Sequence, residues 1–228
     1  MIDFYYLVLV MPAFLIALIM QFRVKSTFNK FSKYATRGGL TGAQAARSIL
    51  DANGLQHINI VPVRGELTDS YSHRENVIRL SDSTYNSTSI AAVGVAAHEA
   101  GHALQYANQY APIKVRTAIL PATQIGANLA WPAMLIGLFF SIPILIFAGI
   151  ILFSLAVFFQ LITLPVEYNA SRRAITVLDQ YGMMTSDELG GAKKVLSAAA
   201  MTYVAALAVS LANLLRIILL FGGGRRRR

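Results

Sequence analysis

Residues 98 to 102 read His-Glu-Ala-Gly-His, a run whose side chains can bind a metal ion and activate water. Four residues of an α-helix turn through about 400°, so the imidazoles of His98 and His102 point to the same side, within about 40° of each other. The two rings can hold one ion, and the carboxylate of Glu99 can take a proton from water at that ion. The pattern predicts one Zn²⁺ per chain, with His98 and His102 as ligands and Glu99 as the catalytic base.

The alternative is a pair of structural histidines that are hydrogen-bonded to backbone carbonyls. The surrounding run, residues 90 to 106, is rich in Ile, Val, Ala and Gly, which is typical of a helix buried on nearly all sides. Burying two imidazoles and a carboxylate there is costly unless a partner compensates them, and a metal ion does so directly. The chain has no cysteine, so its strong metal ligands are His, Asp and Glu. We therefore favour the zinc site.

A catalytic zinc ion normally has three protein ligands and one open position. No histidine follows His102, and the acidic residues downstream of it are Glu167, Asp179, Asp187 and Glu188. Glu167 ends an uncharged stretch, residues 117 to 166, that is long enough to cross a membrane twice and return to the side of the histidines. We expect Glu167 to be the third ligand. The alternatives are a charge that marks the end of a span, or an ion pair with Arg172 or Arg173.

The composition is that of a membrane protein with a modest water-soluble part. Of the 228 residues, 55% are hydrophobic and 14% are charged, and the mean hydropathy is +0.52. The formal net charge is +9; 11 of the 20 Lys and Arg residues lie in 23–116 and 4 lie in 167–194. The positive-inside tendency predicts that both segments face the cytoplasm. These basic residues are scattered and not interleaved with stacking aromatic residues, so no nucleic-acid partner is expected.

Three or four segments are apolar enough to cross a bilayer. The uncharged residues 4–22 predict an uncleaved anchor, because no basic residue precedes them and no small-residue cleavage pattern follows. Residues 117–166 predict a hairpin of two spans that reverses near residues 141–143. Residues 195–215 form the weakest candidate, since they begin with small residues and run into Arg216. As a fourth span they would place the arginine-rich tail outside, so this segment either spans or lies along the inner surface.

The soluble part predicts a few short elements. Thr41 can cap a helix over residues 41–52, which ends at an Asn-Gly pair. Residues 58–63 and 76–81 are rich in β-branched residues and predict two strands, which we expect to be antiparallel. The buried helix that carries the histidines begins after Ser89.

The predicted fold is mainly α and integral to the membrane, with three or four transmembrane helices and a small α+β catalytic region that holds a short antiparallel sheet. The expected segments are a transmembrane anchor (1–22), a cytoplasmic catalytic segment (23–116), a transmembrane hairpin (117–166), a third-ligand helix with a cytoplasmic segment (167–194), a transmembrane or interfacial helix (195–221) and a basic tail (222–228).

The run EYNASRRA, from Glu167 to Ala174, resembles the E-x-x-A-D-x-x-A helix of Ste24/HtpX-like membrane gluzincins. The runs QFRVKSTFNK, LTGAQAARSILDANG, VGVAAHEAGHALQ and LPVEYNASRRA extend this resemblance over nearly the whole chain, to the YugP-type zinc-dependent membrane metallopeptidases. The resemblance implies a zincin-like catalytic region in which His98, His102 and Glu167 match the ligand positions and Glu99 matches the base. Ser171 stands where the Ste24/HtpX-like pattern has Asp, and a hydroxyl orients a zinc ligand less strongly than a carboxylate does.

Peptide hydrolysis also needs a donor for the oxyanion that forms on the attacked carbonyl. The candidates are His73, Tyr71, Tyr168, Asn169, Arg172 and Arg173, although each is better explained as a loop or surface residue, and His57 is a weaker candidate still. The strand over residues 76–81 is either an edge that aligns an extended substrate or an ordinary core strand.

Together these features predict a multi-pass metalloendopeptidase of the cell membrane whose site faces the cytoplasm. Its expected partners are protein or peptide substrates near the bilayer, membrane lipids, and a membrane partner that restrains proteolysis. One alternative is a zinc-stabilised scaffold or chaperone without proteolysis, which would not need Glu99. Another is a zinc hydrolase of a small lipid-like molecule, which would need a deep apolar pocket.

Overall fold

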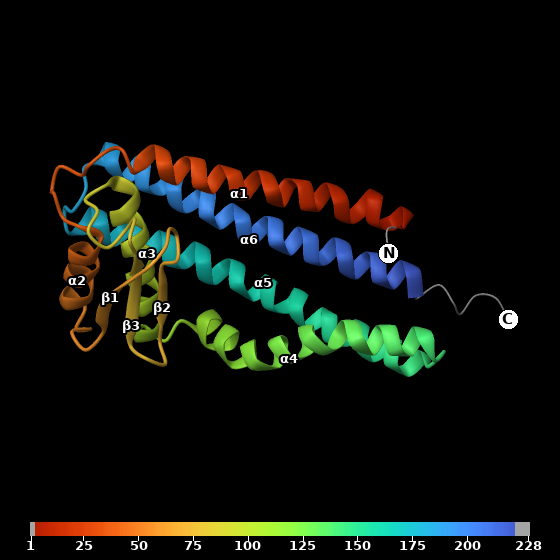
Figure 1. Cartoon of the computed structure of the whole chain (residues 1–228). Helices are drawn as coiled ribbons and strands as arrows, with labels where there is room; N and C mark the ends of the chain where they lie inside the picture. The colour runs from red at the N-terminus through yellow and green to blue at the C-terminus, as the bar shows by residue number, and fades with distance from the viewer. Residues whose placement is uncertain (1–2, 222–228) are drawn as a thin grey trace. The chain divides into compact units, whose positions relative to one another are not determined.

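The structure is a computed structural model that describes residues 3–221 (Figure 1). Two compact units divide this part of the chain. We call residues 3–21, 112–165 and 201–221 the helical unit, and residues 22–111 and 166–200 the mixed unit. The finer division into six segments that the sequence suggests stays a prediction.

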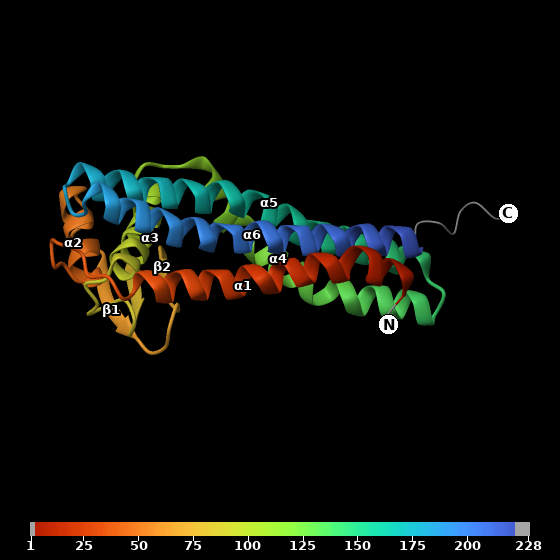
Figure 2. The same ribbon diagram turned by 90° about the horizontal axis from the view of Figure 1, so that it is seen from above.

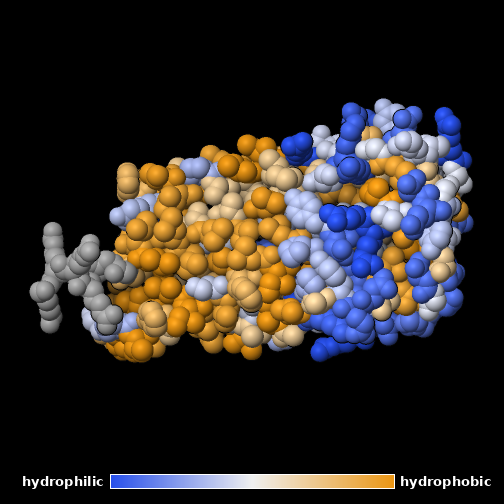
Figure 3. All heavy atoms as spheres, turned by 180° about the vertical axis from the view of Figure 1, so that it is seen from behind, coloured by the Kyte–Doolittle hydropathy of each residue, from blue (hydrophilic) through white to orange (hydrophobic). Residues whose placement is uncertain are grey.

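The helical unit is built from four long helices. A short π-helical turn, η1 (Tyr6–Val10), leads into α1 (Met11–Phe31), and α4 (Ala111–Phe139), α5 (Pro143–Gln180) and α6 (Ser186–Phe221) follow. All four helices are long and apolar enough to cross a membrane. Their surface in this unit is largely apolar, as the orange spheres of Figure 3 show. The structure therefore has four candidate spans where the sequence indicated three or four.

The predicted hairpin is present, with α4 turning back into α5 between Phe139 and Pro143 (Figures 1 and 2). Ser141 takes a positive φ of 54° in this turn. Glycines allow the two helices to approach closely, since a Cβ atom on Gly149 would lie 2.8 Å from the carbonyl oxygen of Ala130.

An ion pair explains why the last helix continues past its arginine. Arg216 Nη2 lies 2.6 Å from Asp3 Oδ2, and the guanidinium lies 5.2 Å from the centre of the Tyr6 ring. Both charged side chains are mostly buried. A charge in an apolar helix is tolerated when it is paired, so Arg216 does not end α6, which extends to Phe221.

The mixed unit contains two further helices and a small sheet. Helix α2 (Gly42–Ala52) has the predicted cap: the Thr41 hydroxyl accepts a hydrogen bond from the Gln44 backbone, and the Gln44 side chain accepts one from the Thr41 backbone. Helix α3 (Ile90–Ala107) has Ser89 as its N-cap, and 14 of its 18 residues are buried, as its sequence predicts.

The predicted sheet is present, but its predicted pairing is wrong. Strands β1 (Asn59–Val63), β2 (Ser70–Ser72) and β3 (Val77–Ser81) lie in the order β1-β3-β2. β1 and β3 are parallel, because the connection between them contains β2, which is antiparallel to β3. No pattern in the sequence indicates β2, since three residues are too few to show an alternation of side chains.

The same topology excludes residues 76–81 as an edge strand. β3 lies in the centre of the sheet, and four of its five residues are buried. Its side chains Ile78 and Leu80 belong to a core that also contains Ile49 of α2, Val93 of α3 and Leu178 of α5. The two edges of this sheet are β1 and β2.

The ion pair in the helical unit leads to a first prediction. Arg216→Gln leaves the Asp3 carboxylate among apolar helices without its guanidinium, so the unfolding temperature of the protein in detergent should fall. Asp3→Asn in the same chain removes the stranded charge and should recover part of the loss.

Thermal unfolding followed by tryptophan fluorescence, with Arg64→Gln as an exposed control, measures both effects. A double variant that is less stable than Arg216→Gln alone would contradict the pairing.

Candidate metal centre

Three side chains from two helices converge in the mixed unit. His98 and His102 project from α3 and Glu167 from α5, and their potential ligand atoms all lie within 4.8 Å of one another. His98 Nε2 lies 3.3 Å and His102 Nε2 lies 3.6 Å from Glu167 Oε2. Two ligands about 2.1 Å from a tetrahedral zinc ion are about 3.4 Å apart, and the separations of Glu167 from the two histidines are close to this value. The cluster can hold one metal ion.

The approach of α3 to α5 depends on a glycine between the two histidines. A Cβ atom on Gly101 would lie 2.7 Å from the carbonyl oxygen of Ala170, closer than a side chain tolerates. Ala170 itself is completely buried. The small residues at this crossing let the Glu167 side chain reach the histidines of the neighbouring helix.

A buried glutamine orients His102. His102 Nδ1 lies 3.0 Å from Gln105 Oε1, and Gln105 Nε2 donates to the Val166 carbonyl at 2.7 Å and to Asn169 Oδ1 at 3.0 Å. With Oε1 facing the ring, Nδ1 carries the proton and Nε2 keeps its lone pair for a metal. Gln105 is completely buried, so these bonds fix its position. Our reading of the sequence missed Gln105, although its place three residues after His102 put it on the same helix face.

The Ser171 hydroxyl lies beside Nδ1 of His98, as the Gln105 side chain lies beside Nδ1 of His102. Ser171 Oγ lies 3.2 Å from His98 Nδ1 and can accept a hydrogen bond from the Nδ1–H group. This is the serine that departs from the Ste24/HtpX-like pattern. The side chain therefore reaches the histidine as a carboxylate would, although it carries no charge.

The electrostatic environment of the cluster favours a cation. Burial raises the pKa of Glu99, although His102 and His98 act against this rise. Burial by itself lowers the pKa of His102, but the hydrogen bond to Glu167 and the charges of Glu167 and Glu99 raise it overall. Burial by itself would raise the pKa of Glu167, but hydrogen bonds from His102 and His98 lower it overall, so this carboxylate stays charged and attracts positive charge to the place where the three ligand atoms meet.

The contacts of Glu167 favour a ligand over an ion pair with arginine, and its role as a zinc ligand stays a prediction. Its carboxylate contacts the two histidines, whereas Arg173 Nε donates to Asn169 Oδ1 at 2.8 Å. Another acidic residue, Glu188, accepts hydrogen bonds from the backbone amides of Arg37 and Thr185.

Two of the candidate oxyanion donors form an aromatic cluster with a residue that our sequence reading missed. Tyr71 of β2 has its hydroxyl 3.4 Å from His73 Nδ1, and the His73 ring stacks on Tyr106 with the ring centres 3.9 Å apart. Burial raises the pKa of Tyr71 to about 12, so its hydroxyl stays protonated and able to donate. Tyr106 follows His102 by four residues on α3, which is the signal that could have indicated it.

Tyr168, Arg172 and His57 are exposed. Asn169 belongs to the Gln105 hydrogen-bond network described above.

Four helices that are long and apolar enough to cross a membrane, and a largely buried cluster of two histidines and a glutamate, are the features of a multi-pass membrane protein that could hold a metal ion. The chain belongs to the family described as "Putative neutral zinc metallopeptidase", whose sequence profile matches residues 6–222. It is similar to the "Putative membrane protease YugP" of Bacillus subtilis (strain 168), with 50% identity over 205 residues that cover 90% of this chain and 91% of that protein. No solved structure matches the chain. The predicted family, the mainly helical membrane fold and the zinc cofactor are thereby confirmed.

The cluster geometry leads to a prediction for the metal content. Replacing His98 or His102 with Ala removes one of three ligands, so bound zinc in the purified protein should fall from about one per chain to near zero. Elemental analysis of the detergent-solubilised protein measures this, with His57→Ala as the control that keeps its zinc. One tightly bound zinc per chain in both ligand variants would overturn the assignment.

Position 171 allows a second, graded prediction. Ser171→Ala removes the hydrogen-bond partner of His98 Nδ1 and should weaken zinc binding about 10-fold, because outer partners of metal-bound histidines typically contribute 10- to 100-fold. Ser171→Asp supplies the carboxylate of the Ste24/HtpX-like pattern and should bind zinc more tightly than the wild type. Competition with a fluorescent chelator measures both affinities, and equal affinities in all three proteins would exclude this role of Ser171.

Proposed function

We propose that the protein is a zinc endopeptidase of the cell membrane that hydrolyses peptide bonds in membrane-associated proteins or peptides. In this proposal His98, His102 and Glu167 bind the ion and Glu99 is the general base. The observation that carries it is the convergence of three ligand atoms beside a buried glutamate that neighbours both histidines. A purely structural metal site would need the ligands but would have no use for Glu99.

A zinc ion held by His98, His102 and Glu167 would supply Lewis acidity, which would lower the pKa of a bound water to about 7 and polarise the substrate carbonyl. Glu99 accepts the proton that the water loses and returns it to the leaving amine. Burial raises the pKa of Glu99, which makes it a better proton acceptor than an exposed carboxylate. Gln105 and Ser171 hold the two imidazoles with their Nε2 atoms toward Glu167, where the ion would bind.

The sheet offers a means of aligning the substrate. β2 is an edge strand, and it carries Tyr71, whose ring packs against Tyr106 of the α3 helix. An extended peptide that pairs with β2 would receive backbone hydrogen bonds regardless of its sequence. This assigns to β2 the role that the sequence suggested for residues 76–81. The Tyr71 hydroxyl then becomes our leading candidate for the oxyanion donor, ahead of His73.

We further propose that the mixed unit faces the cytoplasm. Most of the chain's Lys and Arg residues lie in the segments 23–116 and 167–194, which is the distribution typical of cytoplasmic loops. Glu167 lies on α5, whose preceding residues belong to a candidate span, so substrates near the bilayer are the natural ones. A membrane partner that limits access would protect other proteins from cleavage.

The test compares wild type with Glu99→Gln in nanodiscs and measures bound zinc and cleavage of an unfolded protein together. Glu99→Gln keeps the shape and the ligands but cannot accept the proton. It should therefore bind about one zinc per chain and cleave at least about 100-fold more slowly. Glu75→Gln, an exposed carboxylate paired with Arg79, is the matched control and should retain full activity.

Equal cleavage by wild type and Glu99→Gln would refute the role of Glu99. If both proteins bind zinc and neither cleaves any substrate, including its own chain, the scaffold or chaperone function is favoured instead.

A further inference from the structure

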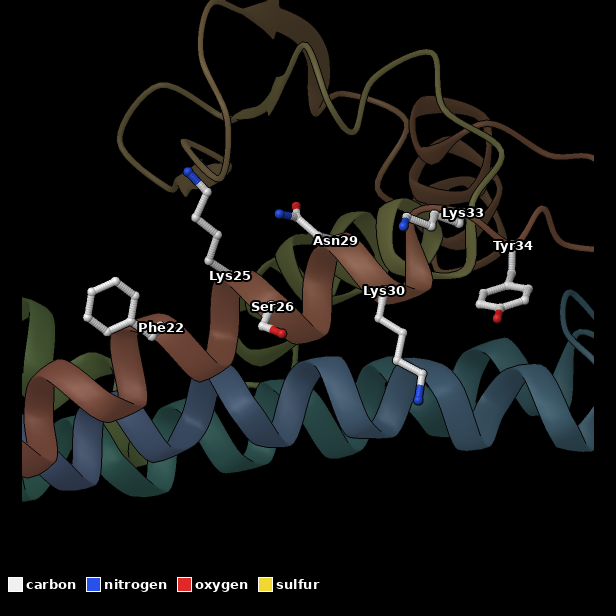
Figure 4. A pocket seen from close by; sticks show the side chains of 7 residues that line it. All are labelled: Phe22, Lys25, Ser26, Asn29, Lys30, Lys33 and Tyr34. Carbon is white, nitrogen blue, oxygen red and sulfur yellow. The ribbon is translucent and has the colours of Figure 1, made fainter.

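Helix α1 continues as one helix beyond its apolar stretch and carries a basic groove there. The uncharged residues end at Phe22, whereas the helix ends at Phe31. The groove has a volume of about 580 Å³ and lies entirely within the mixed unit. Its polar lining consists of Lys25, Ser26, Asn29, Lys30 and Lys33 (Figure 4).

The opposite face of this part of α1 is fixed by packing. Phe28 is 4% exposed and packs in a small core with Ala91 of α3 and Val195 of α6. A Cβ atom on Gly191 would lie 2.9 Å from the Phe31 ring, so the close packing of this ring requires a glycine at position 191. Because this inner face is held in place, Lys25 is held away from it, whereas Lys30 extends to the other side of the helix, with its Nζ 5.7 Å from the centre of the Phe31 ring (Figure 4).

The groove offers donors with little competing negative charge. Three ammonium groups, a hydroxyl and an amide line it. Within the described part of the chain, the carboxylate within ion-pair distance of these lysines is Glu66, 3.9 Å from Lys25 Nζ, and both side chains of that pair are largely exposed. A solvent-exposed pair of this length contributes little stability, so Lys25 can exchange it for a stronger anion. The chemistry fits a phosphate group.

The position along the helix places the groove at the level of lipid headgroups. At 1.5 Å per residue, Lys25 lies about 5 Å and Lys30 about 12 Å beyond Phe22 along the helix axis, and Lys33 follows the end of the helix. The headgroup layer adds about 5 to 8 Å to each side of the hydrocarbon core, and a lysine side chain can reach several ångströms back toward it. Phe22 is 75% exposed and Tyr34 is 55% exposed at the two ends of the groove. Both rings offer apolar surface to the lipid.

We propose that this groove binds the phosphate headgroup of an anionic phospholipid. Phe28 and Phe31 pack the other face of this helix segment against α3 and α6. A lipid that binds the folded groove therefore stabilises the folded mixed unit. The proposal rests on α1 being a membrane span and does not depend on proteolysis or on bound zinc.

The test uses the full-length protein, delipidated in a mild non-ionic detergent and titrated with phosphatidylglycerol or phosphatidylcholine. Native mass spectrometry counts the bound lipids, and thermal unfolding gives a second readout. Wild type should bind phosphatidylglycerol at least 10-fold more tightly than phosphatidylcholine, and phosphatidylglycerol should raise its unfolding temperature. The preference should weaken as the salt concentration increases.

The triple variant Lys25→Gln/Lys30→Gln/Lys33→Gln should lose this preference while keeping its zinc content, which shows that it is folded. The matched control, Arg64→Gln/Lys193→Gln/Lys194→Gln, removes the same charge from exposed sites of the mixed unit and should keep the preference. A preference that survives in the triple variant, or that the control also loses, would overturn the proposal.

Titration with inorganic phosphate forms the last arm of the experiment. If phosphate alone stabilises wild type as strongly as phosphatidylglycerol does, and the triple variant abolishes this effect, the groove is a site for free phosphate and the lipid assignment is wrong. No stabilisation by phosphate at millimolar concentration supports the lipid headgroup as the occupant.

Discussion

The site depends above all on the close crossing of α3 and α5 at Gly101 and Ala170. Any side chain at position 101 would collide with the Ala170 carbonyl, so glycine is what allows the backbones to approach. That contact places Glu167 within 3.6 Å of both histidine Nε2 atoms. The small residues around it leave α3 buried on most sides, and the cluster lies in a largely dehydrated environment where electrostatic interactions are strong.

Burial of this polar cluster requires that each of its groups has a partner. His102 is held through Gln105, and His98 through Ser171, while both face the Glu167 carboxylate with their other nitrogen. The same physical rule operates in the helical unit, where Arg216 is paired with Asp3. In both places the cost of removing charge from water is offset by a specific partner rather than by exposure.

The groove on α1 shows the complementary arrangement, in which charges remain accessible. One face of the helix is fixed by Phe28 and Phe31, and three lysines beyond the end of an apolar stretch line the groove beside it. One helix therefore serves as a span at one end and, in our proposal, as a lipid-binding surface at the other. This division follows from the change in composition at Phe22.

The sequence by itself determined the features that depend on local spacing and length. The i, i+4 histidines, the capped α2 helix, the hairpin and the return of Glu167 to the side of the histidines all follow from helical periodicity and bilayer thickness. Only the tertiary structure decided the parallel pairing of β1 with β3, the central place of β3, and the contacts of Gln105 and Tyr106. These features depend on contacts between segments far apart in the chain, and a three-residue strand or a single glutamine carries no local pattern that specifies its partner.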